Sequence, residues 1–172
     1  AEPKLVSVTF DITVPSFTPG TVYLTRIVND DGTVGDWNPA GTALTQVSET
    51  NWKGTFDILD GTLVEFKFAR GSWETVMKGA DGNEELGNLS LLVDYGENGT
   101  QTFTYTVLNW RDPIVTAFQP ADGALDVPTD TSILITWSQA MPDDACPLLQ
   151  DENGETISGI CEYEPETFTH TF

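Results

Sequence analysis

The sequence predicts an all-β fold, an antiparallel β-sandwich or open barrel. Short segments that alternate apolar and polar residues recur along the 172-residue chain, and such alternation is typical of half-buried strands. Turn-forming pairs such as Pro19-Gly20, Asp60-Gly61 and Asn98-Gly99 separate these segments. No segment has convincing helical periodicity, so the strands are expected to connect through turns and loops.

The first 112 residues contain the strands that are easiest to recognise. The expected strands cover residues 4–14, 21–28, 51–59, 62–69, 89–96 and 100–110. In the fourth, Phe66 and Phe68 alternate with Glu65 and Lys67, which predicts that both rings are buried on one face. The strands together predict one sandwich-like domain over residues 1–112.

A domain boundary is expected at Arg111-Asp112-Pro113, because Pro113 lacks a backbone donor and favours an extended residue before it. The second domain, residues 113–172, has a strand-like "SILITW" segment and a hairpin candidate at Asn153-Gly154. A domain below roughly 70 residues rarely has a sufficient core. We therefore expect this second β-sandwich to be incomplete in the present sequence.

The composition argues against several classes of partner. The chain has 27 Asp and Glu against 7 Lys and Arg, a formal net charge of −20, which disfavours nucleic acid and anionic membrane surfaces. No apolar run is long enough for a spanning helix, and no signal peptide is recognisable. The two cysteines, Cys146 and Cys161, suit a bridge across neighbouring strands, worth roughly 3 kcal/mol; two free buried thiols are the alternative.

Seven segments of the first domain occur in the order seen in one known family. They are "VTFDITV", "VYL", "VGDWNPAGTALT", "NWKGTFDI", "VEFKFARGSWETV", "GNEELGN" and "LNWRD". With these segments, residues 1–112 resemble the family 20 carbohydrate-binding modules, the starch-binding domains of amylases and glucoamylases. The "P-x-x-G-A-x-D-V-P-x-D-T" pattern from Pro120 to Thr131 resembles the opening of bacterial immunoglobulin-like (Ig-like) modules, whose closing strands are missing here.

The resemblance to starch-binding domains implies a set of sugar-binding residues. Position by position, these are Trp37 in "VGDW", Trp73 in "RGSW", Lys67 in "FKF" and Asn88 in "GNEELGN". Glu74 lies in the same segment as Trp73 and is a further candidate, although the family assigns it no role. Indole faces cover the C–H faces of glucose, while polar groups satisfy its hydroxyls.

Each of these residues also has a simpler interpretation. Trp37 and Trp73, both expected in turn-rich loops, would then cover the end of the sandwich, and Lys67 would be an ordinary solvated strand residue. Trp52, Trp110 and Trp137 are expected to belong to the cores.

The second binding site of the family uses two tyrosines. Phe17 lies near the first tyrosine position, but "TQVSET" at residues 45–50 has no aromatic residue. We therefore expect one site, or one strong and one vestigial site.

The resemblance implies a non-catalytic module that anchors a larger secreted, extracellular protein to an α-glucan such as starch or glycogen. No enzymatic activity and no cofactor are expected, because His170 is the single histidine and no serine or cysteine lies in a recognisable nucleophile setting. "DGNEE" (81–85) and "DENGE" (151–155) resemble fragments of calcium loops but are more simply turns, so no metal site is expected. The alternative is a structural or adhesive spacer with a decayed sugar site.

Overall fold

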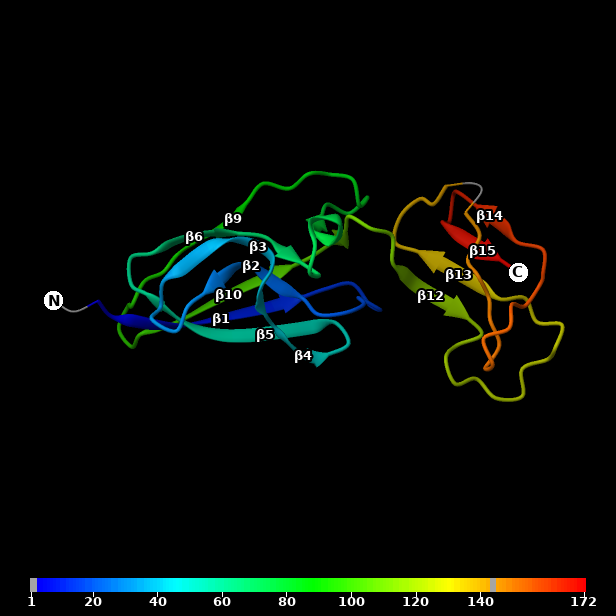
Figure 1. Cartoon of the computed structure of the whole chain (residues 1–172), viewed down its shortest axis with the longest axis horizontal. Coiled ribbons are helices and arrows are strands. Elements are labelled where there is room, and N and C mark those ends of the chain that lie inside the picture. Colours follow the sequence, from blue (N-terminus) through cyan, green and yellow to red (C-terminus); the bar gives the residue numbers. More distant parts are fainter. Residues whose placement is uncertain (1–2, 143–144) are drawn as a thin grey trace. The chain divides into compact units, whose positions relative to one another are not determined.

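The computed structural model describes residues 3–142 and 145–172 (Figure 1). The chain divides into two compact units, one ending at Asp112 and the other beginning at Pro113, and each is described by itself. No α-helix occurs within the described ranges, where strands connected by loops dominate. The predicted all-β sandwich fold is confirmed. No helix of the described residues is long and apolar enough to cross a membrane.

From residue 3 to Asp112, the structure has eleven strands and one short 3-10 helix. They are β1 (Leu5–Thr13), β2 (Tyr23–Val28), β3 (Val34–Ala43), β4 (Thr45–Ser48), β5 (Asn51–Leu59), β6 (Leu63–Phe66), β7 (Phe68–Ala69), η1 (Trp73–Thr75), β8 (Met77–Lys78), β9 (Leu89–Leu92), β10 (Thr100–Thr106) and β11 (Asn109–Trp110).

Two larger sheets organise the first unit. One has the strand order β10-β1-β5-β4 and the other the order β3-β2-β7; β6 pairs with β9, and β11 with β8. β1 runs antiparallel to β5, as expected, but parallel to β10. The expectation of purely antiparallel pairing was therefore wrong at this edge. A parallel pair needs a long crossover connection, and the chain between Thr13 and Thr100 supplies one.

The core of the first unit follows directly from the alternation in β1. Val6, Val8, Phe10 and Ile12 are fully buried, whereas the residues between them face outward or lie at intermediate depth. The Phe10 ring packs edge-on against Phe66, with centroids 5.4 Å apart. Strands distant in sequence thus share one aromatic core, and edge-to-face contacts of this kind stabilise beyond simple area burial.

The predicted strand 62–69 is interrupted at Lys67, between β6 and β7. The hydroxyl of buried Thr25 accepts a hydrogen bond from the Lys67 N–H (2.8 Å) and donates one to the Lys67 carbonyl (3.0 Å). At Lys67, the Thr25 hydroxyl therefore takes part in the hydrogen bonding that backbone groups alone provide in a regular strand pair. Phe66 and Phe68 on either side are fully buried, as predicted.

The second unit contains a four-stranded antiparallel sheet in the order β12-β13-β15-β14. Its strands are β12 (Val115–Gln119), β13 (Leu134–Trp137), β14 (Glu162–Glu164) and β15 (Thr169–Thr171). The predicted turn at Asn153-Gly154 is present, closed by an isolated antiparallel bridge between Gln150 and Thr156. Trp137 is only half-buried, and the fully buried side chain of this sheet is His170.

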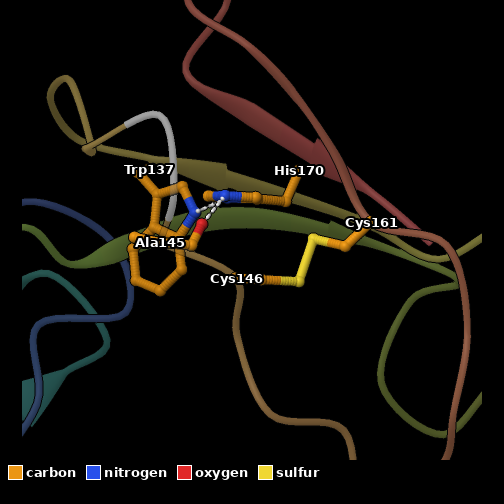
Figure 2. Close-up of a disulfide and its surroundings, with 5 residues drawn as sticks. All are labelled: Trp137, Ala145, Cys146, Cys161 and His170. Atoms are coloured by element: carbon orange, nitrogen blue, oxygen red, sulfur yellow. Dashed lines mark hydrogen bonds between the residues drawn. A yellow bond between two sulfur atoms is a disulfide. The ribbon is translucent and has the colours of Figure 1, made fainter.

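The two cysteines form a disulfide, Cys146–Cys161 (Figure 2). The alternative of free thiols is therefore wrong. The bridge does not join neighbouring strands as expected, because Cys146 lies in a segment without regular structure and Cys161 immediately precedes β14. It fixes an irregular segment next to the sheet, where no strand pairing is available to hold that segment.

Candidate functional site

A hollow of about 380 Å³ opens on the first unit. The residues that line it are Trp37, Lys67, Trp73, Val76, Glu85, Asn88 and Arg111. Four of the five residues predicted from the sequence therefore come together, although they belong to segments that are separate along the chain. The fifth, Glu74, is exposed and is not among the lining residues. The volume is within the usual range for a small-ligand site.

Trp37 lies on β3, so the prediction that places it in a turn-rich loop was wrong. The expectation failed because β2 and β3 pair irregularly on both sides of the Arg26–Trp37 pair. The Thr42 hydroxyl replaces part of the ladder: it accepts from the Val28 N–H (2.9 Å) and donates to the Arg26 carbonyl (2.7 Å). Gly41 permits this close approach, since a Cβ there would lie 2.6 Å from the Arg26 carbonyl oxygen.

Trp73 begins the 3-10 helix η1, in a tight turn after β7. Gly71 has a φ of +102°, a conformation that other residues rarely adopt. The Thr75 hydroxyl donates to the Ser72 carbonyl (2.9 Å) and accepts from the Arg70 N–H (3.2 Å). These bonds close the turn without using the indole, which leaves Trp73 available at the surface.

The two indoles form one angled platform. Their ring centroids are 6.3 Å apart and their planes are inclined by 49°. Each side chain is 39% exposed, in contrast to Trp52 and Trp110, which are buried as predicted. Two large apolar surfaces thus face solvent side by side in a charged, hydrophilic chain, and exposed clusters of this kind commonly mark an interaction site.

Lys67 connects the platform to the segment of residues 79–88. Its ammonium donates to the Leu86 carbonyl at 2.7 Å, two residues before Asn88. Asn88 itself is exposed and immediately precedes β9. An ammonium has three donors, so Lys67 retains capacity for hydroxyl groups in the hollow, and the Asn88 amide can both donate and accept.

An ion pair holds the same segment. Lys78, only 3% exposed, bonds the carboxylate of Glu85. This bond is the main cause that lowers the pKa of Glu85 below its ordinary value of 4.5. Glu85 is therefore ionised at neutral pH and presents acceptor oxygens to the hollow.

Three lining residues, Val76, Glu85 and Arg111, were not predicted from the sequence. Glu85 belongs to both "GNEELGN" and the calcium-loop candidate "DGNEE", and Arg111 belongs to "LNWRD", but the resemblance assigned neither residue a role in sugar binding. Arg111 donates to the Trp73 carbonyl at 3.3 Å. Its position next to the predicted domain boundary was the available signal, but boundary residues carry no pattern that assigns them to a site.

The region expected for a second site is less developed. Phe17 is 46% exposed and has a φ of +58°. The "TQVSET" segment forms β4 and the following turn, and its exposed apolar residue is Val47. This arrangement presents no aromatic pair comparable to Trp37 and Trp73 from those two segments.

The two calcium-loop fragments form turns. The Asp81 carboxylate accepts from the N–H groups of Asn83 and Glu84, both at 2.8 Å. Asp151 accepts in the same way from Asn153 and Glu155, both at 2.9 Å. Across residues 3–142 and 145–172, no group of three or more His, Cys, Asp or Glu side chains is arranged to hold a metal ion.

Comparisons with known proteins yield relatives among large enzymes. No protein-family model matches the sequence. The chain is 35% identical over 119 residues to an amylopullulanase of Thermoanaerobacter thermohydrosulfuricus, covering 68% of this chain and 8% of that protein. It is 37% identical over 115 residues to an alpha-amylase of Niallia circulans, covering 64% of this chain and 8% of that protein.

Among solved structures, a family 15 glycoside hydrolase, the glucoamylase of Hypocrea jecorina, aligns with a TM-score of 0.47 and 26% identity, over 65% of this chain and 18% of that chain. The present chain thus spans less than a tenth of the length of its curated relatives.

Proposed function

We propose that residues 1–112 are a non-catalytic carbohydrate-binding module of the starch-binding type, which binds α-glucan through the hollow at Trp37 and Trp73. The angled, half-exposed indole pair is the observation that carries this proposal. Two inclined aromatic planes match successive glucose units of a curved chain, whereas a flat glucan presents its sugar faces in one plane.

The other lining residues have matching roles. Lys67 would donate to glucose hydroxyls while it holds the Leu86 carbonyl, Asn88 would bond a pair of adjacent hydroxyls, and Glu85 would accept from a further hydroxyl. The sugar is neutral, so the net charge of −20 opposes binding little. Polar groups around an apolar platform are the usual design of a site that needs orientation as well as affinity.

In the full-length protein, the module would serve a domain elsewhere in the polypeptide. The relatives are named amylopullulanase and alpha-amylase, names that denote enzymes of α-glucan breakdown, and this chain corresponds to a small fraction of their length. Attachment to the polymer would raise the effective concentration of substrate at such a domain. The module would act outside the cell, on polymer too large to be taken up intact, and residues 113–172 would be part of an Ig-like spacer.

A titration of the intact chain with β-cyclodextrin, a compact mimic of one amylose turn, tests the proposal. Binding followed by calorimetry and tryptophan fluorescence should saturate, and cellohexaose, a flat β-glucan, should bind far more weakly. Trp37→Ala and Trp73→Ala should each weaken binding by about 1 to 3 kcal/mol, the cost of losing an interfacial aromatic, without unfolding the chain.

Leu63→Ala is the matched control, because Leu63 is an exposed apolar residue of the first unit that does not line the hollow. Its affinity should equal that of the wild type. Wild-type affinity for β-cyclodextrin in both tryptophan variants would reject this site. Absence of any binding at millimolar β-cyclodextrin would favour the alternative, a structural or adhesive spacer with a decayed sugar site.

A further inference from the structure

Basic residues are concentrated at the hollow. The chain has 7 Lys and Arg in total, and residues 113–172 contain none. Lys67 and Arg111 line the hollow, Lys78 bonds its lining residue Glu85, and Arg26 lies beside Trp37. Four of the seven basic residues thus gather around one site of a strongly acidic protein.

The Arg26 guanidinium lies over the Trp37 ring. Its Nε donates to the Gly35 carbonyl at 2.8 Å and its Nη1 to the Glu65 carbonyl at 3.1 Å. With the fork fixed in this way, the guanidinium lies 5.2 Å from the centroid of the Trp37 ring, within the distance of a cation–π contact. One face of the indole is therefore packed against protein, and Gly35, two residues before the indole, is tied to β6.

Arg111 contacts the backbone of Trp73, the residue that carries the other indole. Its Nη1 donates to the Trp73 carbonyl (3.3 Å), and its own N–H donates to the Val76 carbonyl (2.9 Å). Both ends of the short η1 segment are thereby connected to the same residue. Each of the two tryptophans, whose indoles are inclined by 49°, therefore contacts an arginine, and the two arginines belong to different strands or strand ends.

The side-chain hydrogen bonds described above run from the two arginines to backbone carbonyls of the protein. A guanidinium presents its donors in a rigid planar fork, so a donor engaged with a carbonyl orients the rest of the group. This arrangement differs from a cluster that recognises an anion, for which donors would converge on one point. The arginines act on the indole-bearing segments.

We propose that Arg26 and Arg111 are positioning residues that set the relative inclination of Trp37 and Trp73 before any ligand is present. The proposal rests on the proposed function of this hollow in sugar binding. A preorganised platform loses less conformational freedom when it binds, which improves affinity without any additional contact to the ligand.

The test uses Arg26→Gln and Arg111→Gln in the intact chain, with Lys53→Gln as the matched control. Lys53 forms an ion pair with Asp11 at 2.7 Å, and neither lines the hollow, so the change in charge is the same. The first measurement is the far-ultraviolet circular dichroism couplet produced by coupling between the two indoles. Trp37→Ala removes the pair and defines the spectrum without coupling.

Both arginine variants should reduce or invert the couplet in the free protein and weaken β-cyclodextrin binding by about tenfold. In Lys53→Gln, both the couplet and the affinity should stay at the wild-type level. A residue that only contacts sugar would leave the couplet of the free protein unchanged. A residue that only supports the fold would lower the melting temperature without a specific loss of coupling.

Conservative variants provide a second readout. Arg111 uses one side-chain nitrogen on Trp73, so Arg111→Lys should restore most of the couplet. Arg26 uses two nitrogens on two carbonyls, and a lysine supplies only one point of attachment, so Arg26→Lys should not restore it.

An unchanged couplet in both glutamine variants would overturn the proposal. If the couplet is lost in both while the wild-type chain binds no glucan, positioning holds and the proposed function fails.

Discussion

His170 illustrates how much a single residue contributes to the small second unit. Its ring is fully buried and accepts at Nδ1 from the Trp137 indole N–H, at 2.9 Å. Nδ1 therefore carries no proton, and Nε2 donates to the Ala145 carbonyl, as Figure 2 shows. The neutral ring thus links β15, β13 and the segment that enters the disulfide at Cys146.

Removal of these two hydrogen bonds should destabilise the second unit. In His170→Phe, the indole N–H and the carbonyl lose their partner, at a cost of about 1 to 3 kcal/mol for a buried polar group. His170→Gln retains an amide donor and acceptor and should lose less. Calorimetry measures the loss, and the Trp137 indole N–H resonance should shift most in His170→Phe. Equal stability of the two variants would contradict this account.

At the scale of elements, the segment of residues 79–88 is held by its own turn chemistry as well as by Lys67 and Lys78. The Asp81 carboxylate accepts from the N–H groups of Glu84 and Asn83, and these bonds lower the pKa of Asp81 below its ordinary value of 3.8. The ionised form is therefore favoured in the folded state. Its stabilisation is present above pH 3.8 and is lost as the pH falls through the lower pKa of the folded state.

The contribution of Asp81 should consequently depend on pH. Asp81→Asn should speed amide exchange at Asn83 and Glu84 at neutral pH, and the difference from the wild type should shrink below pH 3.8. Nuclear magnetic resonance of the two amides measures the effect. Asp57→Asn, an exposed position on β5, is the control and should leave both amides unchanged. A difference that stays constant with pH would exclude the carboxylate as its source.

At the scale of the whole molecule, the proposed site is contained in one unit. Every residue that lines the hollow precedes Asp112, and the fully buried core residues of β1, β6 and β7 lie in the same unit. The second unit has far fewer buried side chains among its described residues, namely Ile114, Gln139 and His170. The first unit therefore has what a self-sufficient domain requires.

Residues 1–112 produced alone should fold and bind β-cyclodextrin within about twofold of the intact chain, because an independent domain brings its own core. Calorimetric titration of both proteins measures the ratio, and Trp37→Ala in the shorter protein serves as the negative control. Loss of the fold in residues 1–112 would reject the assignment of this range as a domain. Loss of binding with the fold intact would show that the second unit contributes to the site.

The all-β class and most strands of the first unit were determined by the sequence itself. These signals depend on residues that are close in sequence, so they can be recognised without a structure. Examples are the alternation in β1 and β5 and the turns at Asp60-Gly61 and Asn98-Gly99. The family resemblance selected Trp37, Lys67, Trp73 and Asn88, which the fold brings to one hollow; their role in binding stays a prediction.

Only the tertiary structure decided the features that join distant segments. In the folded chain, β1 pairs in parallel with β10. The Thr25 hydroxyl bonds the backbone of Lys67, 42 residues away in sequence, and the Arg26 guanidinium lies over the Trp37 ring. Such contacts depend on which sheets pack together, and no local period or turn records that choice. The strands of this protein can be predicted from local patterns in its sequence, whereas the inclination of its two exposed indoles involves side chains that come into contact only after folding.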